Sequence, residues 1–465
     1  MRRQLQRRSG GRMFAAVSVV AALGLGAAAC SSSNASSTSS TGGKVTISIN
    51  CAPTQAQNPI QHREWVADVA TFEKANPNIT VKSIYNNPCT NLPVFTAQLR
   101  AGTEPNIFYI DFTDLPQVLT AGQAADITSY VNSKTVPTLK DIVPSAMKAV
   151  TAGKTIYGLP TNTYTQGLVY NRKLFSEAGL NPDDPPTTWA QVEADAKKIA
   201  ALGHGIEGWG DYSAGNNGGW HFAPYMDALG GTTVTNAVPP TAGFDNANGQ
   251  AILQALHTLR FTDNAMSKTQ GLAWGTLQAQ FGAGKLGMYI AAPDDIYNQI
   301  TAVDKGNIND IGMGPLPSLT GKPAGSLGGG NAYIFAKSDT PAQIKAGIKF
   351  INFEDLTPGQ GVTFNYARAK ADGIPVGFDE PSLFNGSAGA QVSALRTKYT
   401  TINQSYYKAY VDANEVSDGE PFDAQAVYRL LDPMMLAVLT EPTVNIPALL
   451  KTYATNVNTL LQFSA

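Results

Sequence analysis

Alternating and helical patterns of apolar side chains follow one another after residue 43. KVTISIN (44–50) alternates apolar with polar residues, which predicts a strand, and REWVADVATF (63–72) carries apolar residues at helical spacing. ITVKSIYNN (79–87) predicts a second strand, FTAQLRAG (95–102) a helix that ends at its glycine, and NIFYID (106–111) a third strand. This order is typical of α/β folds, in which helices cover both faces of a largely parallel sheet.

Further segments continue both patterns to the C-terminus. The helix at 187–200 has the clearest boundaries, with prolines before it, Thr187 or Thr188 as N-cap and a glycine after its end. No fixed-period repeat is visible, which argues against a solenoid or a propeller. The other expected strands are 153–160, 167–171, 286–292 and 331–338, and the other expected helices are 249–261, 276–284, 341–354 and 423–439.

Three glycines in FGAGKLGMYI (281–290) have the spacing of a dinucleotide-binding loop: Gly282, Gly284 and Gly287. In a nucleotide fold such a loop follows a strand and opens a helix. Here the predicted helix comes first, so the glycines lie at a helix C-terminus, where the helix dipole is negative and repels phosphate. We therefore interpret the stretch as a turn.

The N-terminus has the composition of an export signal. MRRQLQRRSGGRM carries five arginines and no acidic residue, and an uncharged run then ends in small residues before Cys30. This resembles a bacterial lipobox, with Ala27 where a large aliphatic residue is usual. We predict a lipoprotein signal peptide over 1–30, lipidation of Cys30 and a Ser-rich flexible tether over 31–43. An ordinary cleaved signal is the alternative, and the Sec and Tat routes both stay open.

Two further cysteines, Cys51 and Cys89, follow the tether. Because disulfides persist outside the cytoplasm, an even pair in an exported protein is a candidate bridge. The alternative is two buried free thiols.

Charge and motifs exclude several classes of function. The 33 Lys and Arg residues nearly balance 35 Asp and Glu residues, for a net charge of -2, so no nucleic-acid partner is expected. Four scattered histidines form no zinc motif, and neither G-x-S-x-G nor C-x-x-C occurs. We therefore expect no metal, no cofactor and no catalytic residue.

The glycine turn and five other segments, in the same order, resemble the solute-binding proteins of carbohydrate ABC importers, the group related to maltose-binding protein. FGAGKLGMYIAAPD is similar to that group's F-x-x-G-K-x-A-M segment. The resemblance covers nearly all of residues 44–465. The other matching segments are AQLRAGTEPNIFYID, GKTIYGLP, GLVYNRKLFSEAGL, PPTTWAQVEADAKKIA and GPLPSLTGKPAGSLGGGNAYIFAKS.

The resemblance implies an α/β, two-lobed periplasmic-binding-protein-like fold (type II), with a mostly parallel sheet flanked by helices in each lobe and a hinge between them. The first lobe would comprise 44–163 plus 316–360 and the second 164–315 plus 361–465. It also implies a monomer that binds a mono- or oligosaccharide in the cleft and delivers it to the membrane subunits of an ABC importer. Closure of the hinge on the ligand is a common mode of domain motion.

A sugar presents hydroxyls, which suit carboxylates and amides, and apolar C–H faces, which lie on aromatic rings. Candidates are expected on loops at strand ends and at lobe crossings. Asp111 and Asp114 follow a predicted strand, with helix capping as their alternative role. Tyr164 lies at the expected first lobe crossing.

The remaining candidates come from three later segments. Trp220 is surrounded by glycines and amides, and Trp274 precedes a helix, with packing as its alternative role. Asp294 stands where the family often has a tryptophan, which suggests a hydroxyl contact. Gly330 and Asn331 would let a ligand approach the backbone closely, unless they form a plain turn.

Two other classes of function stay open. A secreted glycosidase needs only two suitably spaced carboxylates and stacking rings. The same fold could also bind a solute that is not a sugar.

Overall fold

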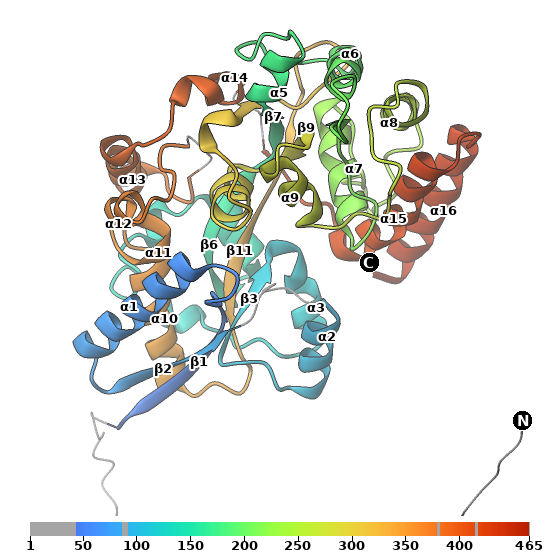
Figure 1. Cartoon of the computed structure of the whole chain (residues 1–465). Helices are drawn as coiled ribbons and strands as arrows, with labels where there is room; N and C mark the ends of the chain where they lie inside the picture. The colour runs from blue at the N-terminus through green and yellow to red at the C-terminus, as the bar shows by residue number, and fades with distance from the viewer. Residues whose placement is uncertain (1–42, 86–91, 379–381, 414–416, 465) are drawn as a thin grey trace, which may run out of the picture. The chain divides into compact units, whose positions relative to one another are not determined.

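The computed structural model describes residues 43–85, 92–378, 382–413 and 417–464. Residues Lys44–Ala465 form one compact unit, shown in Figure 1. The predicted signal peptide with Cys30, most of the predicted tether and Cys89 lie outside the described residues. The predicted Cys51–Cys89 bridge therefore stays a prediction.

The first sheet has the strand order β12-β11-β3-β1-β2, with β6 paired to β11. The βαβ order predicted for its first three strands is confirmed, because β1 pairs in parallel with both β2 and β3. Strand β11 runs antiparallel to β3 and to β6, and β12 runs parallel to β11. The bounds are β1 Val45–Ala52, β2 Ile79–Tyr85, β3 Ile107–Asp111, β6 Gly158–Thr165, β11 Ser326–Phe335 and β12 Ser417–Gly419.

Helices α1 (Pro59–Ala75) and α10 (Pro341–Asp355) pack against this sheet. The backbone N–H of Gln61 donates to the side chain of Asn58 at the start of α1, and Pro59 fits the first turn because its missing N–H has no helical partner there. The ring of Trp65, on the buried side of α1, meets the edge of Phe350 of α10 at 5.7 Å. The first core therefore lies between the sheet and these helices.

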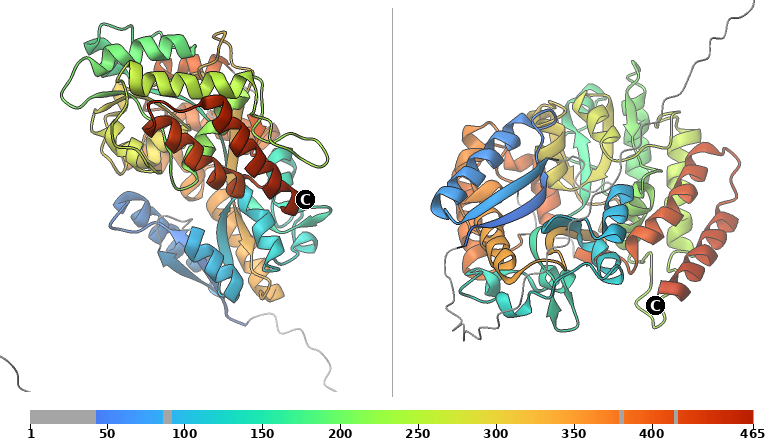
Figure 2. Two further views of the ribbon diagram at one scale, coloured as in Figure 1. Left: turned by 90° about the vertical axis from the view of Figure 1, so that its right-hand side faces the viewer. Right: turned by 90° about the horizontal axis from the view of Figure 1, so that it is seen from below.

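The second sheet has the order β10-β7-β9-β8. Strand β7 is antiparallel to β10 and β9, whereas β8 is parallel to β9. Helices α6 and α7 and the pair α15–α16 build the core around it, and α15 and α16 lie side by side on the face turned to the viewer in Figure 2, left. The bounds are β7 Gly167–Asn171, β8 Glu207–Trp209, β9 Leu286–Ala291, β10 Ile311–Gly314, α6 Trp189–Ala200, α7 Asn217–Ala228, α15 Ala424–Thr440 and α16 Ile446–Ser464.

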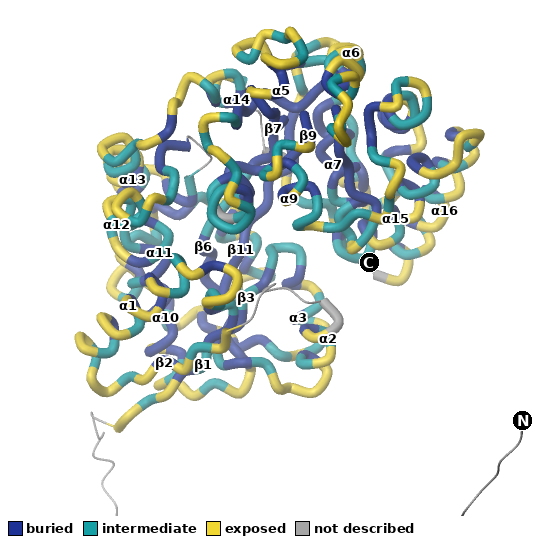
Figure 3. Tube along the Cα trace, viewed as in Figure 1, coloured by how far each residue is buried: buried dark blue, intermediate teal, exposed yellow. Residues whose placement is uncertain are grey.

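The chain passes directly from β6 in the first sheet to β7 in the second at Gln166, and it returns through β10 and β11. The returning strand β11 pairs antiparallel with β3 and β6, but the other three pairings of the first sheet are parallel. The prediction of mostly parallel sheets is wrong for the second sheet only, because β7 is antiparallel to both its neighbours and apolar periodicity carries no information about the direction of a crossing strand. The strands β6 and β11 lie side by side and are buried along most of their length (Figure 3).

The lobe bounds predicted from the family resemblance stay a prediction, and the core packing differs from them in one segment. Phe364, Phe384 and Val392 pack with the first core, although 361–465 was assigned to the second lobe. Tyr407 and Tyr410 pack with residues of the second sheet. The chain thus makes a further passage between the two cores around residue 400.

Residues 276–291 contain the predicted turn. Helix α9 (Thr276–Gly282) is followed by Gly284, whose φ of 68° lies in the left-handed region, and then by β9. Gly282 and Gly284 therefore end a helix, as predicted, whereas Gly287 lies within β9.

Helix α6 also begins as predicted. Thr188 is its N-cap, and Gln191 at position N3 completes the capping box.

Shorter elements complete the unit. Among the described residues, the helices are all too short or too polar to traverse a lipid bilayer. The remaining bounds are α2 Leu92–Ala101, η1 Phe112–Asp114, α3 Leu115–Thr120, η2 Thr128–Tyr130, η3 Leu139–Asp141, α4 Pro144–Ala149, β4 Thr151–Ala152, β5 Thr155–Ile156, α5 Arg172–Glu177, α8 Ala247–His257, η4 Thr258–Thr262, η5 Asp295–Thr301, η6 Ile308–Asp310, α11 Gly361–Phe364, α12 Tyr366–Ala371, α13 Gly386–Tyr399, η7 Gln404–Tyr407 and α14 Lys408–Ala413.

Candidate functional site

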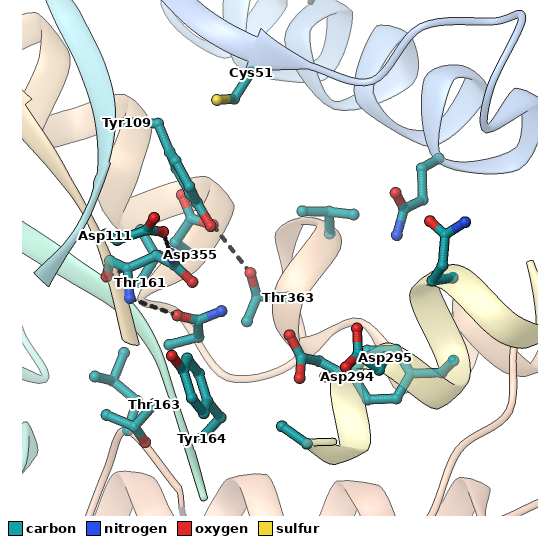
Figure 4. A pocket seen from close by; sticks show the side chains of 18 of the residues that line it. Cys51, Tyr109, Asp111, Thr161, Thr163, Tyr164, Asp294, Asp295, Asp355 and Thr363 are labelled. Atoms are coloured by element: carbon teal, nitrogen blue, oxygen red, sulfur yellow. Dashed lines mark hydrogen bonds between the residues drawn. The ribbon is translucent and has the colours of Figure 1, made fainter. Parts of the chain in front are cut away.

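A cavity of about 1130 Å³ lies where the ends of β3, β6, β9 and β11 meet helices of both cores (Figure 4). Seven of the eight predicted ligand residues line it: Asp111, Asp114, Tyr164, Trp220, Trp274, Asp294 and Asn331. The structure therefore brings together residues that are as much as 220 positions apart along the chain. Whether they bind a ligand stays a prediction.

The first wall of the cavity is built at the end of β3. Asn331 of β11 lies opposite Asp111 in the ladder and donates its side-chain N–H to the Asp111 carboxylate at 2.6 Å. The backbone N–H of Asp111 in turn donates to the Asp114 carboxylate at 3.2 Å, which stabilises the short turn η1. Capping and cavity lining, which the sequence presents as alternatives, are thus combined in these two residues.

Tyr164 lies near the end of β6 and is held from the second core. Its hydroxyl donates to Glu420 at 3.3 Å, and the hydroxyl of Tyr428 also donates to Glu420. The Trp220 ring meets Tyr164 edge to face at 6.5 Å and forms a side-chain hydrogen bond with Glu420. Glu420 therefore binds both Tyr164 and Trp220 and fixes their positions relative to each other.

Trp220 lies on helix α7, whereas the sequence predicts it among loop residues. Helix α7 tolerates the Gly218–Gly219 pair because it packs closely on α15, where a Cβ on Gly219 would collide with the backbone of Tyr428. The Asp432 carboxylate of α15 accepts the backbone N–H groups of Asn216 at 2.6 Å and Gly219 at 3.1 Å. This contact fixes the start of α7 and with it the position of Trp220.

The cavity lining also includes Trp274 and two adjacent carboxylates. Trp274 is 46% exposed, and its backbone N–H donates to Asn217 at 2.8 Å. Asp294 and Asp295 follow β9, and Figure 4 shows both side chains at the cavity with Tyr164 across from them. Asp295 accepts a hydrogen bond from Gln278 at 3.2 Å.

Gly330, the eighth candidate, is not among the residues that line the cavity. A Cβ at this position would come within 2.5 Å of the Phe112 ring and would also meet the backbone of Asn162. The glycine thus permits close packing beneath η1. Its neighbour Gly329 lies in the same way against the Tyr164 ring, with Cζ 2.5 Å from where a Cβ would be.

Burial raises the pKa of the carboxyl groups around the cavity. It raises the pKa of Asp111 and of Asp294 to about 6, that of Glu420 to about 7 and that of Asp295 to about 8. The pKa of Asp114 is raised by burial and then by the nearby charge of Asp111. These groups therefore hold protons at a pH where exposed carboxylates are fully ionised.

Several lining residues were not predicted. Glu420 and Asp295 are carboxylates in ordinary turn and helix-start contexts, so nothing in their sequence neighbourhood marks them. Thr161, Asn162 and Thr163 line the cavity from β6, and the run TNTYT of polar residues within a buried strand was the one available signal. In the part of the chain that the structure describes, no cluster of His, Cys, Asp and Glu is arranged to hold a metal ion.

The chain is similar in sequence to a named periplasmic binding protein. The sn-glycerol-3-phosphate-binding periplasmic protein UgpB of Yersinia pestis is 29% identical over 185 residues, which cover 36% of this chain and 40% of that protein. The chain thus matches about two-fifths of the length of this relative.

Solved structures share the fold over most of the chain. A solute-binding protein of an ABC transporter from Thermotoga lettingae, bound with α-D-tagatose, superposes with a TM-score of 0.71 at 21% identity and covers 90% of this chain and all of its own length. The GacH receptor of Streptomyces glaucescens, solved with acarbose, has a TM-score of 0.69 at 17% identity and covers 90% of this chain and 99% of its own. These likenesses confirm the predicted two-lobed periplasmic-binding-protein-like fold.

A family model matches more than half of the chain. The model of the bacterial extracellular solute-binding proteins matches residues 58–354, which include the whole second sheet and all strands of the first sheet except β1 and β12. The members of this family are binding proteins that work outside the cytoplasm. The chain belongs to the bacterial extracellular solute-binding protein family.

Proposed function

We propose that the protein is an extracytoplasmic sugar receptor that binds its ligand in the cavity and delivers it to the membrane subunits of an ABC importer. The observation that carries the proposal is that the rings of Tyr164, Trp220 and Trp274 line the cavity together with carboxylates and amides. Aromatic rings suit the apolar faces of a sugar, and the oxygens suit its hydroxyls. The proposed ligand residues are those seven cavity-lining candidates, with Glu420 added.

The similar proteins differ in how far they support a sugar as the ligand. The two solved structures carry tagatose and acarbose, whereas the name of the Yersinia relative states a phosphate ester. A phosphate would meet several carboxylates here, so the cavity favours an uncharged or cationic ligand. We propose that the protein binds its ligand without converting it.

We also propose that Cys30 carries a lipid that tethers a monomeric receptor to the membrane, and that Cys51 and Cys89 form a disulfide. The arginine-rich, apolar and small-residue segments before Cys30 support the first statement. Intact-mass spectrometry of the membrane-extracted protein tests both, because the lipid adds mass and the bridge removes two hydrogens. An unmodified N-terminus or two free thiols would contradict them.

Isothermal titration calorimetry against mono- and oligosaccharides tests the receptor. At least one sugar should bind at micromolar concentration or tighter, and the Trp220→Ala variant should lose about 1–3 kcal/mol of binding free energy, as expected for a buried aromatic contact. Trp189→Phe is the matched control, because Trp189 is buried in the second core outside the cavity. It should bind normally.

Two results would contradict the proposed sugar-receptor function. If no sugar binds to the folded protein, the proposal that the ligand is a sugar is rejected. If a bound sugar is converted into shorter products on long incubation, a glycosidase is favoured instead.

A further inference from the structure

Carboxylates from several separate elements meet at the cavity. Two come from the end of β3 and from η1, two follow β9, and one follows β12. Of the described residues that line the cavity, Arg396 is the only lysine or arginine. Seven acidic residues line the cavity. We refer to the five on these elements as the cavity carboxylates: Asp111, Asp114, Asp294, Asp295 and Glu420.

The two other acidic residues that line the cavity are Glu64 and Asp355, and Asp355 accepts a hydrogen bond from the Thr363 hydroxyl at 3.0 Å. Glu64 is paired with Arg368 at 3.3 Å, and Arg368 binds both oxygens of Asp68 at 2.6 Å. Within the described residues, no Lys, Arg or His forms an ion pair with any of the five cavity carboxylates. No basic side chain of the described residues therefore offsets the charge of those carboxylates that are ionised.

Tyr164 lies at the centre of the group. Burial and then the charges of Glu420, Asp111 and Asp294 raise the pKa of its hydroxyl, so carboxylates from three elements act on one phenol. The charge of Glu420 also raises the pKa of Asp114, and the charge of Asp111 raises the pKa of Glu420. The negative charge is thus concentrated beside the ring that the proposed function assigns to sugar stacking.

We propose that the ligand is a cationic saccharide, one with a protonated amine, whose ammonium group lies among the cavity carboxylates beside Tyr164. The proposal rests on the proposed sugar-receptor function and adds the charge of the ligand. An ammonium group can donate three hydrogen bonds and carries the positive charge that is missing around the cavity carboxylates. Hydrogen bonds between charged partners are stronger than those between neutral groups. A neutral hydroxyl can donate to one carboxylate but leaves the others unneutralised.

The state of the carboxyl groups gives the proposal a second readout. Burial raises their pKa, to about 7 for Glu420 and to about 8 for Asp295, so part of the group is protonated at neutral pH. A bound cation favours the ionised form and lowers these pKa values, so binding releases protons. A neutral sugar has no comparable effect.

Matched pairs of sugars test the proposal by calorimetry at pH 7. The pairs are glucosamine with glucose, galactosamine with galactose, deacetylated chitobiose with cellobiose, and trehalosamine with trehalose. In at least one pair the amine should bind tenfold or more tightly than its neutral partner, and its binding enthalpy should change with the ionisation enthalpy of the buffer. If the neutral members bind as well as the amines, the cationic ligand is rejected and the sugar receptor stands. If no member of any pair binds, both are rejected.

Neutralising substitutions locate the effect. Asp294→Asn and Glu420→Gln keep the shape and an oxygen acceptor but remove the charge, so affinity for the amine should fall about ten- to hundredfold further than affinity for its neutral partner. Two positions are needed because Glu420 also binds Tyr428, and its substitution could disturb the fold, which a thermal melt would show. Asp339→Asn is the control, since Asp339 is a partly buried carboxylate outside the cavity that binds Asn106 at 2.6 Å. Equal weakening of both sugars would show that the carboxylates serve only as hydroxyl acceptors and would overturn the proposal.

Discussion

Individual residues show which parts of the site can be predicted from sequence. Asp111, Tyr164 and Trp220 were identifiable because acids after a strand and rings among polar residues are unusual in a core. Glu420 was not, since the segment DGEPF has the composition of any surface turn. Its role depends on three side chains that only the fold brings to it, namely Tyr164, Trp220 and Tyr428.

At residue scale, Gly330→Ala should lower the free energy of unfolding by about 1–3 kcal/mol, the usual cost of overpacking a closed site. The added Cβ would lie 2.5 Å from the Phe112 ring, in a strand that is buried on both sides. Urea unfolding measures the change. Gly419→Ala is the control, because a Cβ there meets nothing within 4 Å. Equal stability of the two variants would contradict the packing role of Gly330.

Elements with clear caps and periodicity were predicted well. Helix α6, the βαβ order of the first sheet and the turn before β9 follow from local rules, because caps, apolar spacing and glycine turns act within a few residues. Helix α7 does not, since the GNNGG segment disfavours a helix. It forms because the glycines allow contact with α15, and the direction of β11 likewise depends on pairing between distant strands.

At element scale, Asp432→Ala should destabilise the protein by about 1–2 kcal/mol, because two backbone N–H groups at the start of α7 lose their acceptor. Affinity for the ligand should fall as well, since the same contact positions Trp220. Urea unfolding and calorimetry measure the two effects. Asp245→Ala, at an exposed position, should change neither. Unaltered stability of Asp432→Ala would show that the cap contributes nothing.

The whole molecule carries several carboxyl groups whose pKa is raised in the folded state. Burial raises the pKa of Glu64, Asp355 and Glu420 to about 7 and that of Asp295 to about 8. In the unfolded chain these groups titrate near about 4. The folded state therefore binds more protons between these limits, and its stability falls as the pH rises.

At the scale of the whole molecule, the melting temperature of the ligand-free protein should decrease steadily from pH 5 to pH 8. Differential scanning calorimetry across that range measures it. Asp295→Asn should flatten the upper part of the decrease, because the amide does not ionise. A melting temperature that is constant or rises over this range would show that these carboxyl groups titrate normally.

Gly329 has a consequence for how receptors of this kind diversify. The Tyr164 ring lies directly on this glycine, so the height of the ring above the strand is set by a residue that has no side chain. A single methyl group there would shift the ring toward the bound solute without replacing any residue that the solute touches. Selection for new nutrients, in nature or in the laboratory, can therefore act from underneath the binding surface, through a position that inspection of ligand contacts alone would overlook.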